Sequence, residues 1–256
     1  MLAYKELVRK VLHGGHNVLR RNSNCWTIPG MTMTYYVGDK FPILTGRKIY
    51  VAGVFGELAA MVRGPKNLND FKKWGCNYWD SFADEEGNLK VDYGNAWLEP
   101  VNQIERVLWQ LDNDSNSRRI MINGWRPENI DSLTLPCCHF AYQFVTIGDE
   151  LHLIWYQRSA DIMVGVPSDM VLANLLLIGF ANSCERKYKP GTVTMMFGDA
   201  HIYEEHHRQV HEYLGREIHD LPTYKLTHMD IATFNPNMLE LVNYKHEGVI
   251  NFKLFN

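Results

Sequence analysis

The sequence has no excess of basic residues, no regular cysteine spacing and no apolar run of membrane-spanning length. Its 26 Lys and Arg stand against 29 Asp and Glu, a balance that does not favour nucleic-acid binding. Five scattered cysteines without a C-x-x-C motif argue against a disulfide framework or zinc site and favour a reducing compartment. The longest apolar stretch, residues 170–184, is shorter than the roughly 20 residues that span a bilayer. We therefore expect a soluble, cytoplasmic protein with neither nucleic-acid nor membrane partners.

The eleven histidines raise the question of a metal site. His207 and His211 lie one helical turn apart, with His201 and His206 nearby, which is geometrically compatible with metal binding. No carboxylate–histidine signature surrounds them, so the favoured interpretation is a polar helix surface, and we expect no metal.

Hydrophobic periodicity predicts both helices and strands along the chain. Helices are expected at residues 4–12, 51–62, 101–111, 168–184 and from about Ala200. Strands are expected at residues 25–36, 139–146, 151–157 and 192–197, with short strands in the last forty residues. Ser168 and Asp169 can cap the fourth helix. No repeat, linker or charge run interrupts the chain, so we expect one domain, residues 1–256, of α+β class on one large sheet.

Four polar features stand out. Pro136-Cys137-Cys138-His139 places two thiols at the start of a strand, where only one can face a given pocket and where a core cysteine is the commoner case. Arg158-Ser159-Ala160-Asp161 suits either an anion site or a surface turn. The tandem Arg118-Arg119 is of a kind that is commonly solvated. Residues 198–203 (GDAHIY) form an expected strand-to-helix corner, where His201 and Tyr203 either bind a ligand hydroxyl or belong to an ordinary cap.

Taken in order, RR…PCCH…YQRSAD…GVPSD…GDAHIY closely resembles the thymidylate synthase family, over nearly the whole chain. The resemblance implies a thymidylate synthase-like fold with a large mixed β-sheet flanked by helices. It also implies a sheet-mediated homodimer with shared active sites, and 5,10-methylenetetrahydrofolate as cosubstrate without a metal.

The resemblance assigns the chemistry to a few side chains. Cys138 matches the nucleophile that adds to C6 of a pyrimidine nucleotide, after which C5 attacks the methylene group of the folate; Cys137 replaces the usual proline. Arg158 matches the arginine that lowers the pKa of this thiol and grips the phosphate. Glu57 matches the carboxylate that organises proton transfers, and Tyr93 the tyrosine associated with loss of the C5 proton. His139, next to the nucleophile, is counted in the same catalytic set.

Further residues match the family's binding positions. The expected nucleotide ligands, including two arginines that reach the partner's site, are Arg20, Ser159, Arg118, Arg119, Gly165, His201 and Tyr203. The expected folate-side residues are Trp79, Asp161, Phe82, which stands where a second tryptophan is common, and Tyr50, which stands where histidine is common.

One departure bears on the substrate. Where the family reads P-F-N, this chain reads Pro167-Ser168-Asp169, and the asparagine that pairs with uracil is lost. A carboxylate would repel O4 of uracil but accept a hydrogen bond from the N4 amine of cytosine. Full pairing with cytosine needs a proton shared between Asp169 and N3, which burial would favour by raising the carboxyl pKa. The purely structural alternative is that Asp169 is only a helix cap.

The aspartate is what deoxycytidylate hydroxymethylases of the same family show. We therefore expect dCMP hydroxymethylation, in which water adds where synthases deliver a hydride, and a phage origin with action in the host cytoplasm. The tail Lys253-Leu254-Phe255-Asn256 replaces the family's usual small apolar terminus. Closure of the site normally excludes water, and a polar terminal residue would instead hold a water or leave a gap for it. The alternatives are a dCMP C5-methyltransferase and a dUMP-using thymidylate synthase. A non-enzymatic binding homologue is disfavoured, because Cys138, Arg158, Glu57, Tyr93 and His201 are all retained.

Overall fold

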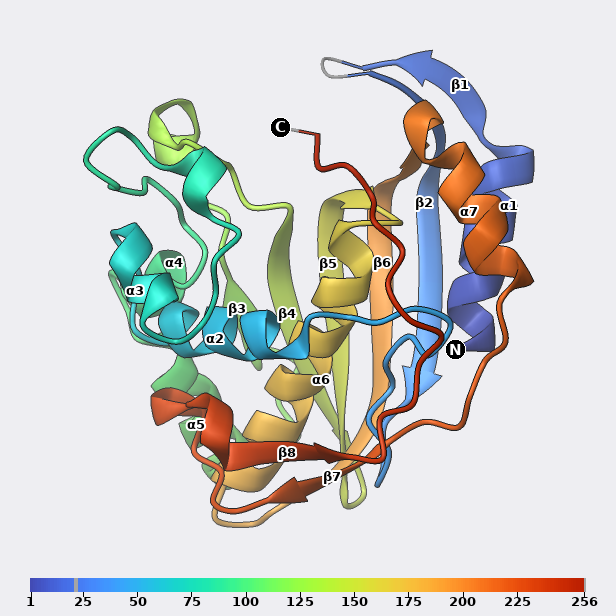
Figure 1. The fold of residues 1–256 in the computed structure, drawn as a ribbon. Coiled ribbons are helices and arrows are strands. Elements are labelled where there is room, and N and C mark those ends of the chain that lie inside the picture. The colour runs from blue at the N-terminus through green and yellow to red at the C-terminus, as the bar shows by residue number, and fades with distance from the viewer. Residues whose placement is uncertain (21–22, 256) are drawn as a thin grey trace.

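A six-stranded mixed sheet organises the chain in the computed structural model, which describes residues 1–20 and 23–255 (Figure 1). Arg21, the second residue of the RR motif that begins at Arg20, and Asn256 of the C-terminal tail lie outside the described residues. The strand order is β1-β2-β6-β5-β4-β3, and every neighbouring pair is antiparallel except β5 and β6. The strands are β1 His16–Leu19, β2 Asn24–Tyr36, β3 Met121–Asn123, β4 His139–Ile147, β5 Glu150–Asp161 and β6 Lys189–Tyr203.

The helix α6, Gly165–Ser183, connects the two parallel strands and forms the centre of the core. It packs on β5, β6 and the helix α2, Val51–Met61. By length and composition alone α6 could cross a membrane, but 78% of its apolar window is buried inside the protein. A helix that is apolar on all sides and enclosed by its own chain is a core helix.

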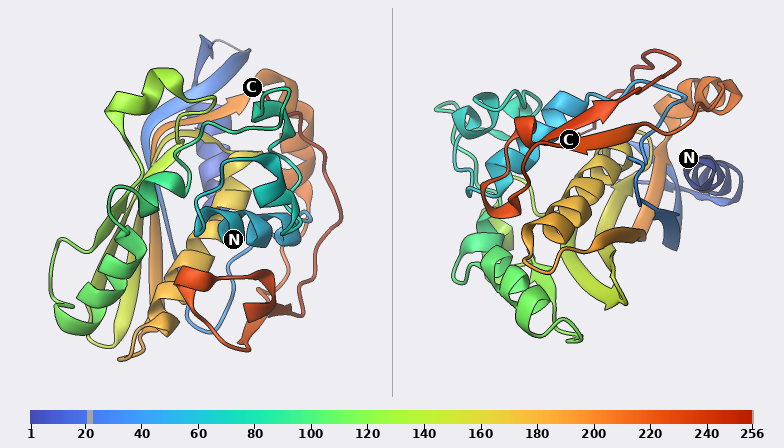
Figure 2. Two further views of the ribbon diagram at one scale, coloured as in Figure 1. Left: turned by 90° about the vertical axis from the view of Figure 1, so that its left-hand side faces the viewer. Right: turned by 90° about the horizontal axis from the view of Figure 1, so that it is seen from below.

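The two faces of the sheet differ in what they carry. Figure 2 shows α2 and α6 stacked on one face, and the C-terminal residues run across this same side. Along β6, Val193, Met195 and Phe197 are buried beneath the helices. Met196 points the other way and is exposed, as side chains of a strand alternate between faces.

The remaining elements lie around this centre. The other helices are α1 Leu2–Gly14, α3 Leu68–Lys72, α4 Asn95–Leu98, α5 Gln103–Asn113 and α7 His207–Gly215. Single 3₁₀ turns occur at Asp80–Phe82, Pro127–Ser132, Glu204–His206, Ile231–Thr233 and Pro236–Met238. A separate two-stranded sheet pairs β7 Thr223–Leu226 with β8 Leu239–Val242.

The α+β class with one large sheet is confirmed, and most of the predicted elements are present. The helix expected from about Ala200 is present as α7, but its start is wrong: the helix begins at His207, and residues 198–203 continue β6 to Tyr203. Their backbone is paired on both sides: His201 lies opposite Thr27 of β2 and Asp161 of β5. Long-range pairing therefore prevails over the turn-like residues Gly198 and Asp199.

The predicted cap of α6 is also wrong. The helix begins at Gly165 with Val164 as its N-cap, so Ser168 and Asp169 lie inside it. The Asp161 carboxylate, not that of Asp169, accepts the backbone N–H groups of Met163 (2.9 Å) and Val164 (3.0 Å) at the entry to the helix.

Truncating a buried side chain of α6 tests the central place of this helix. Leu177 has no exposed surface, so Leu177→Ala should lower the free energy of unfolding by about 2–5 kcal/mol through lost burial and a residual cavity. Leu2 of α1, 75% exposed, supplies the matched control, and Leu2→Ala should change stability by less than about 0.5 kcal/mol. Urea denaturation measures both; equal effects would contradict the assignment of α6 as the core.

Candidate active site

Cys138 lies directly before β4 and is fixed by its backbone on two sides. Its N–H donates to the Tyr93 hydroxyl (2.5 Å), and its carbonyl accepts the Arg158 backbone N–H (2.8 Å). The Arg158 guanidinium donates to the carbonyls of Cys137 and Pro136, both at 2.8 Å. The nucleophile predicted from the sequence and two of its predicted neighbours are thus brought together.

Arg158 lowers the pKa of the Cys138 thiol, as the resemblance implied, but burial has the larger effect. Burial raises its pKa above the ordinary value, and the Tyr93 hydroxyl and the Arg158 charge lower it only in part. Asp169 adds to the increase at pH values above its own pKa, where it is ionised. The arginine acts in the expected direction, but desolvation outweighs it. In this arrangement Cys138 is a neutral thiol near pH 7. Cys137 is fully enclosed, and burial raises its pKa further, as expected of an inert core cysteine.

Asp169 is a largely buried carboxyl on α6 that faces β5, and 14% of its side chain is exposed. One of its oxygens, Oδ2, accepts a hydrogen bond from the Gln157 side-chain amide at 2.8 Å. The other, Oδ1, lies 3.8 Å from Nε2 of His139. Burial raises the pKa of Asp169 to about 8, the Gln157 hydrogen bond lowers it in part, and the Glu57 and Asp161 charges raise it. The carboxyl is therefore predominantly protonated near pH 7, and the interpretation of Asp169 as a helix cap is wrong.

The sequence reasoning missed Gln157. Its side chain is 3% exposed, and its Oε1 accepts the indole N–H of Trp155 at 3.0 Å. Because the indole N–H can only donate, it identifies the oxygen end of the Gln157 amide, and the NH₂ group must therefore point at Asp169. The available signal was the strand period of two, which places Trp155 and Gln157 together on the buried face, where an amide needs partners.

His139 is a neutral ring enclosed by aromatic side chains. Burial lowers its pKa to about 3, and its Nδ1 lies 2.6 Å from the Tyr142 hydroxyl. The Tyr93 and Trp155 rings pack on it at 4.8 and 4.4 Å between centroids. With both the imidazole and Asp169 uncharged, their 3.8 Å approach is a polar contact and not an ion pair.

Glu57 is the second buried carboxyl of the site. It accepts hydrogen bonds from the Tyr78 hydroxyl (2.7 Å) and the Trp79 indole N–H (2.9 Å). Burial raises its pKa to about 7, a value suited to taking and returning a proton near neutrality. Trp79 is buried, stacks on Phe71 at 4.9 Å and meets the edge of Phe82 at 5.6 Å. Trp79 thus forms a wall behind Glu57 and does not present an open ring face, and the partly buried Phe82 packs against it.

A second polar cluster joins β2 and β6. The Asp199 carboxylate accepts hydrogen bonds from Arg20 (2.7 Å) and Thr27, and lies 3.3 Å from Nδ1 of His201. His201 first, with Thr27 and Arg20, lowers the pKa of Asp199 to about 2. The Tyr203 ring stacks on Phe255 at 4.2 Å, so the C-terminal segment covers this end of the site. The sequence reasoning also missed Asp199, whose carboxylate binds the guanidinium of Arg20.

A hollow of about 230 Å³ opens beside the first turns of α6. It is lined by Arg47, Lys48, Ile49, Tyr50, Val164, Pro167, Ser168, Ile250, Asn251 and Phe252. Tyr50 is 55% exposed here, and its hydroxyl donates to the Gly75 carbonyl at 3.1 Å. At the neighbouring Gly165, an added Cβ would stand 3.6 Å from Asp169 Oδ2, so glycine keeps this side of the carboxyl open.

Arg118 and Arg119 are not brought to Cys138. Both are exposed between α5 and β3, where Met121 pairs with Gln143 of β4. Extending that register sets Arg119 beside Val145, roughly 20 Å along the sheet from Cys138 at about 3.3 Å per residue. Three of the four histidines considered as metal ligands have other neighbours: the His207 ring lies 4.1 Å from Trp26, His206 contacts the Lys253 carbonyl through Nε2 (2.8 Å), and His201 contacts Asp199. His211 is exposed on α7.

The comparison with protein families agrees with this geometry. The family model described as thymidylate synthase matches residues 2–255, and the chain belongs to this family. The thymidylate synthase-like fold is thereby established, together with folate-dependent one-carbon transfer to C5 of a pyrimidine nucleotide with methylenetetrahydrofolate as cosubstrate.

The pH dependence of thiol alkylation tests the state of Cys138. Because burial raises its pKa, the alkylation rate should rise with a midpoint above the ordinary value of about 8.5. Tyr93→Phe should raise that midpoint further, because it removes the hydroxyl that lowers the pKa. Mass mapping after iodoacetamide treatment follows Cys138, with the enclosed Cys137 as internal control. A midpoint near pH 7 would contradict this account.

Proposed function

We propose that this member of the thymidylate synthase family converts dCMP, 5,10-methylenetetrahydrofolate and water to 5-hydroxymethyl-dCMP and tetrahydrofolate. The observation that carries the proposal is Asp169, a largely buried and protonated carboxyl held by Gln157 at the position where the family reads the base. The product and the base are proposals, whereas the one-carbon transfer follows from the family.

A protonated carboxyl alone does not distinguish cytosine from uracil. One oxygen donates and the other accepts, and exchanging the proton between them would match either base. Cytosine offers an acceptor at N3 and a donor at N4; uracil offers the reverse pattern at N3 and O4. Selectivity therefore requires that the proton stay on one particular oxygen.

Gln157 supplies that constraint. Its amide donates to Oδ2, and the carbonyl oxygen of a carboxylic acid is the better acceptor, so the proton is favoured on Oδ1. We propose that Oδ1–H meets N3 while Oδ2 accepts the N4 amine with its second lone pair. Uracil would then meet donor with donor and acceptor with acceptor, a mismatch that in buried sites can reach about 10⁴-fold.

The catalytic steps follow from the same cluster. Cys138 loses its proton and adds to C6 of the base, and the electron pair of the C5–C6 double bond becomes available at C5. The methylene carbon of the folate bonds to C5. Loss of the C5 proton then breaks the bond between this carbon and the folate nitrogen, which releases tetrahydrofolate and leaves a methylene group on C5, and water adds to that group as the C6–sulfur bond breaks. Tyr93, whose hydroxyl contacts Cys138, is placed to take part in removal of the C5 proton, and Glu57 to pass protons near neutral pH. Departure of Cys138 restores the double bond.

The hollow beside α6 suits the folate. Tyr50, Pro167 and Phe252 give it an apolar and aromatic wall that a flat ring system can contact, and Arg47 and Lys48 are cations at its border. The Asp161 carboxylate accepts the backbone N–H groups at the start of α6. We therefore propose that Asp161 affects folate binding indirectly, by holding this end of the helix in place. Water entering near the tail adds to the methylene group on C5 and gives the hydroxymethyl product. If the tail excludes water, a hydride from tetrahydrofolate reduces that group instead and leaves dihydrofolate, which is the alternative reaction of a dCMP C5-methyltransferase.

A homodimer is part of this proposal. Met196, Tyr36 and Met121 are exposed on strands of the sheet, and burial of such a face is what association would gain. Arg118 and Arg119 are exposed and distant from Cys138, as side chains that serve a partner's site must be. In the assembly they would join Arg158, Arg20 and Ser159 around the phosphate.

Exchange of the base-reading carboxyl tests the substrate. Asp169→Asn replaces the fixed O–H donor by an amide that can pair with uracil, so the ratio of kcat/KM for dCMP to that for dUMP should fall by about tenfold or more. Gln157→Leu leaves Asp169 in place but removes the amide that fixes the position of its proton. This variant should also lower the ratio of kcat/KM for dCMP to that for dUMP. Unchanged selectivity in Asp169→Asn would refute the role of Asp169 in reading the base.

The two adjacent cysteines form a matched pair for the nucleophile. Cys138→Ser should abolish turnover while nucleotide binding, measured by calorimetry, persists, because the hydroxyl is a far weaker nucleophile. Cys137→Ser should retain activity, since its side chain is enclosed in the core. The reverse pattern would show that the nucleophile has been misassigned.

A further inference from the structure

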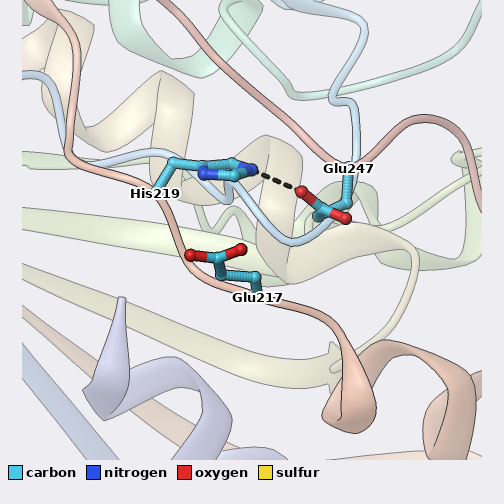
Figure 3. A group of neighbouring side chains, drawn as sticks. All are labelled: Glu217, His219 and Glu247. Carbon is cyan, nitrogen blue, oxygen red and sulfur yellow. Dashed lines mark hydrogen bonds and ion pairs between the residues drawn. The ribbon is translucent and has the colours of Figure 1, made fainter.

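A cluster of three potential metal ligands lies outside the active site. Glu217 and His219 lie in the segment between α7 and β7, and Glu247 follows β8 (Figure 3). His219 Nε2 and Glu247 Oε1 are 2.5 Å apart, and one ligand atom from each of the three residues lies within 4.8 Å of the others. Within the described ranges, 1–20 and 23–255, this is the one group of three or more such side chains so placed.

The backbones that carry two of these ligands are fixed by a single buried residue. The Thr45 hydroxyl accepts the His219 N–H (3.0 Å) and donates to the His219 carbonyl (3.3 Å). The Thr45 carbonyl accepts the Glu247 N–H at 3.0 Å. Arg216 adds a hydrogen bond from its guanidinium to the Glu247 carbonyl at 3.0 Å. Two chain segments distant in sequence are therefore held in register before any ion binds, which reduces the entropy cost of forming a site.

We propose that Glu217, His219 and Glu247 bind a divalent transition-metal ion, with zinc as the best match. One imidazole nitrogen and two carboxylate oxygens suit zinc, which binds three protein ligands and a water, whereas Mg²⁺ and Ca²⁺ prefer oxygen ligands alone. Tetrahedral bonds of about 2.0–2.1 Å put ligand atoms roughly 3.3 Å apart, so the His219–Glu247 contact opens and Glu217 moves in. The side chains of His219 and Glu247 are 25% and 35% exposed, which leaves room for this adjustment.

The position of the site gives the ion a structural consequence. Glu247 directly precedes the C-terminal segment, whose residues 250–252 line the hollow beside α6. An ion bridging Glu247 to Glu217 and His219 would fasten the base of that segment to the end of α7. The ion takes no part in the proposed reaction, and the inference stands whether or not dCMP is the substrate.

Calorimetric titration of zinc into untagged, chelator-treated protein tests the site. We expect one equivalent per chain, with affinity at least about tenfold weaker in both His219→Gln and Glu247→Gln, since loss of a ligand costs no less than loss of a supporting residue. Mg²⁺ should not compete. Circular dichroism of each variant checks that the fold is retained.

Two controls exclude other zinc sites. His211→Gln removes one member of the His207–His211 pair on α7 and should leave zinc affinity unchanged. X-ray absorption of the zinc-loaded protein should show nitrogen and oxygen ligands only; sulfur in the coordination shell would place the ion on a cysteine and overturn the proposal. Equal affinities in the wild type and His219→Gln would overturn it as well.

Discussion

The protonated state of Asp169 is the constraint on which the proposed activity depends. The carboxyl sits on an apolar helix that connects two central strands, where only 14% of its side chain is exposed and a charge is poorly solvated. Its one close donor is Gln157, itself fixed by Trp155, so the carboxyl is both neutral and oriented. The same desolvation raises the pKa of Glu57 to about 7 and keeps Cys138 as a thiol. Burial thus determines which groups of the cluster carry a proton, and hydrogen bonds determine how those groups are oriented.

Much of the fold could be predicted from local pattern, and the errors occurred where distant pairing decides. Periodicity placed the helices near α1, α2 and α5 and the strands near β2, β4 and β5 within a few residues. It failed at residues 198–203, because Gly198 and Asp199 look like a turn while strands far away in sequence hold them in β6. It also failed at Ser168, where a typical capping residue lies inside α6.

The residues of the candidate site could be predicted from the sequence, but their hydrogen-bond partners and protonation states could not. Motifs singled out Cys138, Arg158 and Asp169, and the structure brings them together. The partners that orient them, Gln157 above all, could not be chosen from sequence, because nothing local reveals which buried amide meets which carboxyl. The direction of the Cys138 pKa was likewise hidden, since it depends on a balance between burial and Arg158 that only packing determines.

The central claim, that an oriented neutral carboxyl selects cytosine, is tested most directly by identifying the product. Purified protein would receive equal amounts of dCMP and dUMP with 5,10-methylenetetrahydrofolate, and mass spectrometry would follow both nucleotides. The account predicts 5-hydroxymethyl-dCMP, with dUMP left unchanged and the folate recovered as tetrahydrofolate. A methylated product from dUMP would contradict it.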